Sequence, residues 1–363
     1  MTTSRMTATL TDRGRIALAE QPVPELRPGH VLIEVHRSLI SPGSELGGWH
    51  ALSAQRSNGN GATPHPPKPF GYSNAGVVLE TGEGVTQLAP GDRVAAIGVN
   101  YALHTTHAVV PHHLCVKLPA NVDFEEGAYG MLLATAMQGL RRADPRLGEY
   151  VCVVGLGLLG QLAARLFQLS GCYVIGWESL PQRCAIARGF GIPDVVRSDA
   201  EDAVPRTLAF TVGHGLDFSV FAFGGNGEEV FDKTLLSLKR SPDGHPTGAI
   251  IVLGHAQFPF KTKPMHNVDI RMASRTGPGY HDKAWESGAD YPLVYVRWTT
   301  HSNLELAIRL IAEGRINVRQ LTTHRIPFAN AETEIDRILD APDEILGVVF
   351  EMKDPTTGTA RHA

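Results

Sequence analysis

The chain has 363 residues, of which 43% are hydrophobic and 19% are charged, a composition typical of a globular protein with more than one domain. Its formal net charge of −4 argues against a nucleic-acid or membrane-surface role. No apolar run approaches the roughly 18 residues of a membrane span, and the first residues lack a signal-peptide core. The four cysteines form no CxxC pair. We therefore expect a cytoplasmic protein with reduced, buried thiols.

The first third of the chain is predicted to be rich in β-strands. Short apolar runs between glycine and proline breakers predict strands at residues 31–40, 73–82, 92–99 and 107–111. The turn Ser-Pro-Gly-Ser-Glu at residues 41–45 follows the first of these strands directly.

The pattern changes near residue 124. Residues 124–143 favour a helix, and apolar strands then alternate with helices up to about residue 256. This alternation predicts a parallel sheet with helices on both faces. The last third returns to mixed structure, with an amphipathic helix predicted at 304–315 and a closing strand at 345–352.

The clearest motif is a glycine loop between a predicted strand and a predicted helix. Gly155, Gly157 and Gly160 form a GxGxxG pattern, and Glu178 ends the next strand about 20 residues further on. The glycines allow the backbone to approach a pyrophosphate, and the helix N-terminus attracts its charge. Glu178 is placed to accept hydrogen bonds from the adenine ribose and to repel a 2′-phosphate, which favours NAD. Arg183 could bind that phosphate, so NADP remains the alternative.

These residues resemble the medium-chain dehydrogenase/reductase superfamily, the fold of zinc alcohol and polyol dehydrogenases. The resemblance also covers Pro-Gly-Asp-Arg-Val at 90–94 and Leu-Thr-Thr-His-Arg-Ile-Pro-Phe at 321–328. It implies an α/β protein with two domains and a homodimer joined through the dinucleotide sheets. A GroES-like, mainly-β catalytic domain would comprise 1–130 and 281–363, and a Rossmann domain with a doubly wound parallel sheet would comprise 131–280. Three further residues would contact the cofactor: Thr135, Leu159 and Gly254.

The resemblance fails at the family's catalytic zinc. Pro42 stands where the family has its first cysteine ligand, Tyr72 where it has a histidine, and Met131 where it has a cysteine or glutamate. Such side chains do not make a reasonable zinc site. The four-cysteine lobe of the structural zinc is also absent. The chain therefore resembles a zinc-free branch that includes bacterial bidomain oxidoreductases, and we expect no zinc.

A site without a metal needs hydrogen-bond donors and a proton acceptor for the reacting oxygen. Tyr72 is predicted to donate, since an unperturbed tyrosine has a pKa of about 10, although it could simply fill the space. Ser44 matches the family hydroxyl that passes a proton from the substrate toward the cofactor ribose. The alternative is that it only caps the local turn. Glu45 is predicted to act as a base or to pair with an arginine. His50 lies three residues beyond the family's relay histidine.

Two further groups of polar residues are expected to stay outside the chemistry. His104 and His107 lie three apart on a predicted strand, so they point to opposite faces and cannot easily share an ion. A solvated or substrate-lining role is expected for them, with His104 near the mouth of the site. Residues 280–282 (Tyr-His-Asp) are expected to form a surface loop.

The sequence thus predicts an NAD-dependent, zinc-independent oxidoreductase. It would interconvert a secondary alcohol and a ketone on a polar small molecule such as a sugar, a cyclitol or a biosynthetic intermediate. This substrate class rests on side-chain polarity and on the resemblance. Two alternatives stay open: a zinc-free quinone or enoyl reductase using NAD(P)H, and a non-catalytic dinucleotide-binding protein.

Overall fold

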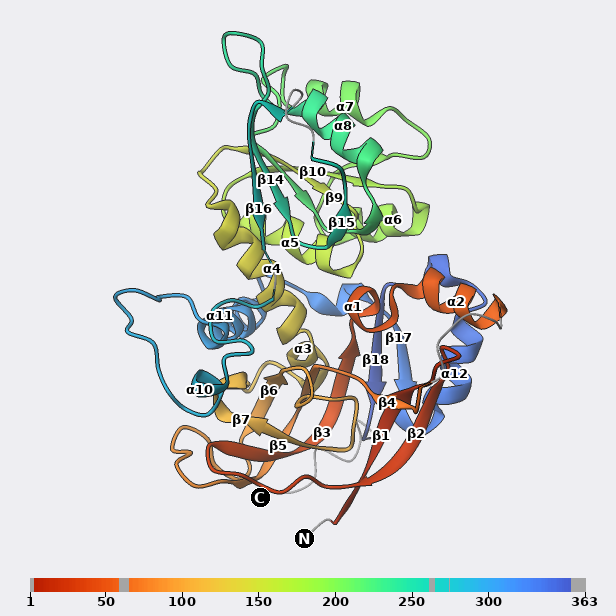
Figure 1. The fold of residues 1–363 in the computed structure, drawn as a ribbon, viewed down its shortest axis with the longest axis vertical. Helices are drawn as coiled ribbons and strands as arrows, with labels where there is room; N and C mark the ends of the chain where they lie inside the picture. The colour runs from red at the N-terminus through yellow and green to blue at the C-terminus, as the bar shows by residue number, and fades with distance from the viewer. Residues whose placement is uncertain (1–2, 59–64, 261–264, 274, 354–363) are drawn as a thin grey trace. The chain divides into compact units, whose positions relative to one another are not determined.

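The structure is a computed structural model that describes residues 3–58, 65–260, 265–273 and 275–353 (Figure 1). Internal contacts divide the chain into two units. Unit 1 combines Met1–Ala134 with Gly277–Ala363, and unit 2 is Thr135–Thr276. These junctions lie four residues from the domain boundaries predicted from the sequence.

Unit 1 is mainly β. Its strands are β1 (Ser4–Leu10), β2 (Ile16–Pro22), β3 (His30–Ile40), β4 (Lys68–Pro69), β5 (Ser73–Thr81), β6 (Arg93–Ile97), β7 (His107–Pro111), β8 (Cys115–Lys117), β17 (Thr322–Pro327) and β18 (Gly347–Glu351). A 7-stranded sheet has the order β17-β18-β3-β5-β6-β8, with β7 also paired to β3, and a 3-stranded sheet has the order β2-β1-β4. Within these sheets β17 and β18 are parallel and the other pairs are antiparallel.

The helices of unit 1 are short and lie between its strands. They are α1 (Pro42–Leu46), α2 (Trp49–Asn58), α3 (Phe124–Ala128), α10 (Lys283–Glu286), α11 (Thr300–Ala312) and α12 (Ala331–Ile338), with 3₁₀ turns η1 (His112–Leu114), η2 (Val318–Leu321), η3 (Phe328–Asn330) and η4 (Pro342–Glu344). Apolar side chains of α2 and α12 pack with β1, β3 and β18 in one buried core. Helix α4 (Gly130–Ala143) runs across the junction between the units.

Unit 2 is a doubly wound α/β domain. Six parallel strands follow the order β11-β10-β9-β12-β14-β16. They are β9 (Tyr150–Val154), β10 (Tyr173–Glu178), β11 (Asp194–Arg197), β12 (Phe218–Phe221), β14 (Thr247–Val252) and β16 (Asn267–Met272), beside a small pair, β13 (Gly224–Asn226) and β15 (His255–Gln257). Its helices are α5 (Leu158–Leu169), α6 (Pro181–Gly189), α7 (Ala203–Phe210) and α8 (Glu228–Ser237).

The connections of unit 2 explain its layers. The chain runs from β9 outward to β11, then crosses to β12 and continues to β16. Because parallel crossovers are right-handed, α5 and α6 cover one face of the sheet and α8 covers the other. The apolar run of β9 is buried on both faces, as its sequence predicted. The predicted fold class, a GroES-like mainly-β domain with a Rossmann domain, is confirmed.

None of the helices in the described ranges combines the length and the apolar composition needed to cross a bilayer.

Candidate functional site

The glycine loop of unit 2 has the backbone that a dinucleotide-binding loop requires. Gly155 follows β9 with φ of 85° and donates its backbone N–H to the carbonyl of Trp177 at 2.8 Å. Gly157 is the extended residue before α5. A Cβ atom at Gly160 would lie 1.9 Å from the carbonyl oxygen of Gly155. The loop can therefore turn this sharply only with glycine at residues 155 and 160.

Glu178 ties this loop to the end of β10. Its side chain is buried, with 6% of the residue exposed. Oε2 accepts a hydrogen bond from the backbone N–H of Leu156 at 2.9 Å, and Oε1 accepts from Ser179 and Leu180 at 2.8 and 3.0 Å. Each carboxylate oxygen has two lone pairs, so acceptor capacity remains for a ligand hydroxyl. Glu178 thus shapes the loop and stays suitable for binding a ribose.

Arg183, on α6, lies beside the same loop. Its Nη1 atom is the atom nearest to a Cβ placed at Gly157, at 3.9 Å. Its Nε is buried and finds no hydrogen-bond partner among the described residues. A cation at this place is consistent with either cofactor, since a guanidinium can pack along an adenine or bind a 2′-phosphate.

Gly254 lies at the same edge of the sheet as the glycine loop. Val154, Phe221 and Val252 are paired across β9, β12 and β14, and Gly155 and Gly254 follow the first and last of these strands. A Cβ at Gly254 would meet the carbonyl oxygen of Phe223 at 2.3 Å. The chain reverses its winding direction between β9 and β12, which is where ligands bind in such sheets.

Leu159 lies on α5 and Thr135 on α4, and both are half-buried. Their predicted contacts with a nicotinamide ring stay predictions.

In unit 1, Tyr72 forms the centre of a polar cluster. It precedes β5 and is 9% exposed. Burial, followed by the negative charge of Glu45, raises the pKa of Tyr72 well above its usual value, while hydrogen bonds from the hydroxyls of Ser41 and Ser44 act in the opposite direction. The phenol is therefore held neutral, which suits a proton donor and disfavours a base.

Glu45 and His104 meet behind this tyrosine. Oε2 of Glu45 accepts the backbone N–H of Ser41 at 2.7 Å and lies 3.4 Å from Nε2 of His104. The other ring nitrogen of His104 shares a hydrogen bond of 2.6 Å with the hydroxyl of Ser38. The expectation of a solvated or substrate-lining His104 is wrong, because its side chain is 0% exposed. Glu45 has a histidine partner where the sequence suggested an arginine.

Gly71 allows Tyr72 and His104 to lie on crossing segments. It has φ of 119°, and a Cβ there would lie 2.3 Å from the backbone nitrogen of His104. The backbone N–H of His104 donates to the carbonyl of Phe70 at 3.0 Å. The two segments therefore cross in direct backbone contact, and this brings residues 45, 72 and 104 into one cluster.

The three positions that carry zinc ligands in the resembling family lie in this part of unit 1. The hydroxyl of Ser73, next to Tyr72, lies 3.3 Å from the backbone nitrogen of Met131, whose side chain is buried. Pro42 begins α1. Prolyl, phenol and thioether groups do not fit a zinc ion. In the described ranges no three His, Cys, Asp or Glu side chains gather closely enough to hold a metal.

His50 is not brought into the cluster. It lies on α2, its side chain is 56% exposed, and its Nε2 is 2.9 Å from a carboxylate oxygen of Asp343. Tyr280, by contrast, was expected on the surface but is buried and accepts a hydrogen bond of 3.0 Å from the backbone N–H of Val99. Its proximity adds slightly to the raised pKa of Tyr72. Nothing in the sequence links residue 280 to residue 72.

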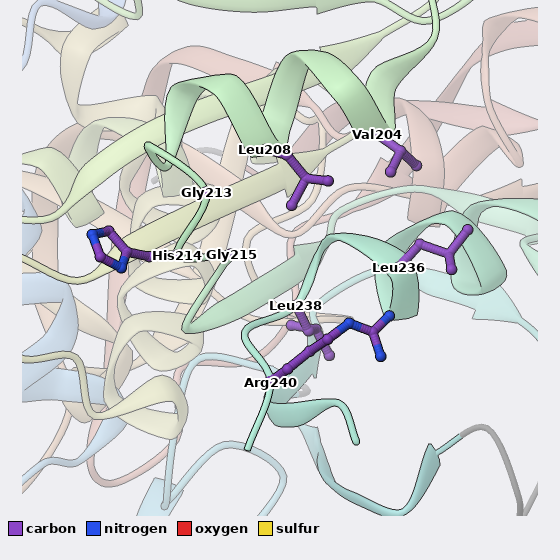
Figure 2. A pocket seen from close by; sticks show the side chains of 8 residues that line it. All are labelled: Val204, Leu208, Gly213, His214, Gly215, Leu236, Leu238 and Arg240. Carbon is purple, nitrogen blue, oxygen red and sulfur yellow. The ribbon is translucent and has the colours of Figure 1, made fainter. Parts of the chain in front are cut away.

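Unit 2 also contains a pocket that is separate from the glycine loop and from the polar cluster around Tyr72. It has a volume of about 640 Å³. Its lining combines apolar side chains of α7 and α8 with residues of the loops that follow these helices: Val204, Leu208, Gly213, His214, Gly215, Leu236, Leu238 and Arg240 (Figure 2). The segment 213–215 precedes β12, whereas the glycine loop follows the end of the neighbouring β9. The pocket therefore lies toward the opposite edge of the sheet from the loop.

Comparison with known proteins agrees with this fold. Residues 27–120 match the alcohol dehydrogenase GroES-like domain. The matched domain lies within unit 1, and the chain as a whole is similar in fold to solved oxidoreductases. The class of protein is therefore an NAD(P)-dependent oxidoreductase acting on CH–OH or C=O groups.

Two curated relatives are named for a sugar and a sugar acid. A probable D-xylulose reductase A of Arthroderma otae is 24% identical over 354 residues, which cover 89% of this chain and 91% of the relative. L-idonate 5-dehydrogenase of Vitis vinifera is 27% identical over 304 residues, or 74% of each chain. Among solved structures, an Escherichia coli oxidoreductase of unknown specificity matches with a TM-score of 0.76 and 20% identity, over 97% of this chain and 100% of its own.

Proposed function

We propose that this protein is an NAD-dependent, zinc-independent oxidoreductase that interconverts a secondary alcohol and a ketone. The observation that carries the proposal is the buried, neutral Tyr72 beside Glu45, at the position of a family zinc ligand. A phenol donor can polarise a carbonyl oxygen as a metal would. The substrate class we propose is a sugar, a cyclitol or a similar polyhydroxylated intermediate, which the names of both relatives support.

The cofactor would be held by unit 2. The backbone of Gly155, Gly157 and Gly160 would face the pyrophosphate, and Glu178 would bind the ribose hydroxyls. NAD supplies a two-electron acceptor for the hydrogen on the alcohol carbon. The buried carboxylate of Glu178 favours NAD over NADP, because a 2′-phosphate beside it would be repelled.

Unit 1 would handle the substrate oxygen. In the reducing direction the Tyr72 hydroxyl donates a hydrogen bond, and then a proton, to the carbonyl oxygen. Ser44 orients the phenol through its own hydroxyl. In this direction Glu45, in its protonated form, returns a proton to the phenol and becomes a carboxylate. The zinc independence of this scheme rests on the donor set at positions 42, 72 and 131.

The experiment that tests this function measures cofactor binding first and turnover second. Quenching of intrinsic fluorescence would give the affinities for NADH and NADPH. Rates would then be measured on D-xylulose, L-idonate, sorbitol and a cyclitol, with a quinone and an enoyl thioester as the competing class. Binding of NADH with turnover of a polyol or ketose supports the proposal. Turnover of only the conjugated substrates would establish the reductase alternative, and binding without any turnover would establish a non-catalytic protein.

We infer further that the protein acts on its small-molecule substrate in the cytoplasm as a homodimer. The four cysteines are free, which suits a reducing compartment. Strand β16 is the last strand of the described parallel sheet and leaves one backbone edge for pairing with a second copy. Sedimentation velocity of the full chain tests this, and a monomer at micromolar concentration would contradict it.

A further inference from the structure

The ring of His104 is fixed from every side. Nδ1 lies 2.6 Å from the Ser38 hydroxyl, and Nε2 lies 3.4 Å from Oε2 of Glu45. The edges of Phe70 and Phe350 pack against the ring, with centroid distances of 4.7 and 5.3 Å. Because the side chain is also inaccessible to solvent, it cannot turn or exchange a proton directly with water.

The two oxygens of Glu45 have different surroundings. Oε2 accepts the backbone N–H of Ser41 and faces His104. Oε1 is buried and has no hydrogen-bond partner among the described residues. Leaving a buried carboxylate oxygen without a hydrogen-bond partner is energetically costly, so such an atom is rarely retained without a use.

The proton arrangement follows from the hydrogen bonds. The carboxylate of Glu45 can only accept, so the ring nitrogen that faces it donates, and Nδ1 of the neutral ring then accepts from the hydroxyl of Ser38. The ring proton is consequently on Nε2, where it points at the Glu45 carboxylate. The titratable groups that face Glu45 are His104, on the segment before β7, and Tyr72, before β5, with Tyr280 adding to the surroundings of Tyr72.

We propose that His104 is a positioning residue, which holds Oε2 of Glu45 and so reserves Oε1 for the proton that leaves the substrate alcohol. This inference rests on the proposed alcohol–ketone chemistry. In the oxidising direction the alcohol O–H and C–H bonds break and the C=O bond forms. The hydrogen on carbon leaves with two electrons to the dinucleotide. The hydroxyl proton replaces the Tyr72 proton, and the Tyr72 proton goes to Oε1, so that Glu45 becomes a neutral acid.

The test compares two substitutions at His104 in the full-length protein. His104→Phe keeps an aromatic ring between Phe70 and Phe350 but removes the donor to Glu45. His104→Gln keeps a side-chain N–H that can reach the same oxygen. The control is His107→Phe, since His107 is half-buried on β7 and its ring contacts Thr106 rather than the cluster.

The first readout is the pH dependence of kcat with NAD and the fastest polyol of the panel. In His104→Phe we expect kcat to fall about tenfold and the acidic limb to move upward by about one pH unit, because the carboxylate has lost a stabilising donor. KM should stay within about twofold. His104→Gln should recover most of the rate, and His107→Phe should match the wild type. An unshifted acidic limb in His104→Phe would overturn the inference.

The second readout needs no substrate and separates this inference from the proposed function. Infrared spectra of each variant, taken as differences against its Glu45→Gln counterpart, report the pH at which Glu45 becomes protonated. That pH should be higher by about one unit in His104→Phe and nearly unchanged in His104→Gln. If His104→Phe does not fold, Ser38→Ala replaces it, since this change removes the hydrogen bond to Nδ1 of His104. The pH at which Glu45 becomes protonated should then rise by less than one unit. Identical spectra in all variants would reject the role of His104 even if the enzyme is an active dehydrogenase.

Discussion

The carboxylate of Glu178 accepts a 2.9 Å hydrogen bond from the backbone N–H of Leu156, inside the glycine loop. The residue that would select the cofactor therefore also supports the loop that would bind it. Glu178→Gln keeps one acceptor oxygen and removes the charge. We expect the ratio of the NADPH to the NADH dissociation constant to fall about tenfold or more, which corresponds to about 1.4 kcal/mol. Fluorescence titrations measure both constants.

The matched control for this change is Glu229→Gln, on α8 of the same unit. Its side chain is 81% exposed and pairs with Lys233 on the same helix. It should leave both dissociation constants unchanged. An unaltered ratio in Glu178→Gln would show that this carboxylate does not select the cofactor.

Gly160 permits the close return of the chain onto Gly155. An added Cβ would lie 1.9 Å from the Gly155 carbonyl oxygen, which no small adjustment relieves. Gly160→Ala should weaken NADH binding at least about tenfold and destabilise the protein by about 1–3 kcal/mol. Gly189→Ala is the control, since a Cβ there meets no atom within 4 Å. Calorimetric melting and NADH titration of both variants decide the matter, and equal behaviour would refute the steric argument.

Tyr72→Phe removes the proposed proton donor and little else. We expect kcat to fall by about 10²–10⁴-fold, the usual contribution of a positioned acid or base, with the NADH dissociation constant unchanged. Stopped-flow measurement of NADH formation under saturating substrate gives the rate of the chemical step. Tyr295→Phe is the control, because that tyrosine is exposed. A loss of less than about threefold would assign Tyr72 a packing role alone.

The raised pKa of Tyr72 also predicts a difference in alkaline stability. Burial, then the charge of Glu45, raises the pKa in the folded state, whereas the unfolded chain has the ordinary value of about 10. The stabilisation is complete below about pH 10 and is lost as the pH rises toward the folded-state value. Each such tyrosine contributes a slope of up to about 1.4 kcal/mol per pH unit, and Tyr72→Phe should lack its share.

Urea unfolding at about pH 8 and about pH 10.5 measures this effect, provided that the two proteins are compared as differences between the pH values. Tyr129 is another buried tyrosine with a raised pKa and is present in both proteins, so it cancels. Equal losses of stability in wild type and variant would show that Tyr72 ionises as readily in the folded protein as in the unfolded chain.

Chelation tests the proposed zinc independence. Dialysis against a strong chelator should leave the rate with the fastest polyol unchanged, and elemental analysis of the purified protein should find far less than one zinc per chain. The reason is the donor chemistry of Pro42, Tyr72 and Met131. Stoichiometric zinc whose removal abolishes turnover would contradict the proposal, and restoration by added zinc would confirm the contradiction.

The fold could be predicted from the sequence because the patterns that specify it are local. Apolar strands such as residues 150–154 and the glycines after them specify a strand, a turn and a helix in one continuous stretch. The link from Glu178 to the loop was not predictable in detail, since both carboxylate oxygens bind backbone N–H groups whose positions depend on the folded turn.

Only part of the polar cluster of unit 1 could be predicted from the sequence. Tyr72 and Glu45 stood out by their position in family motifs. The pairing of Glu45 with His104 joins residues that are 59 apart in sequence. Tyr280, which accepts the backbone N–H of Val99, is 181 residues away from that partner. Side-chain pairs at such separations depend on how strands cross, and strand periodicity alone cannot specify the crossing. For the same reason His50 was assigned by counting along the chain and is found facing Asp343 instead.

The narrow crossing at Gly71 has a consequence for anyone who wishes to redesign substrate choice. Because a Cβ at this glycine would come within 2.3 Å of the backbone nitrogen of His104, a side chain here would displace a tyrosine and a histidine together. A mutant library around Tyr72 should therefore leave this glycine untouched.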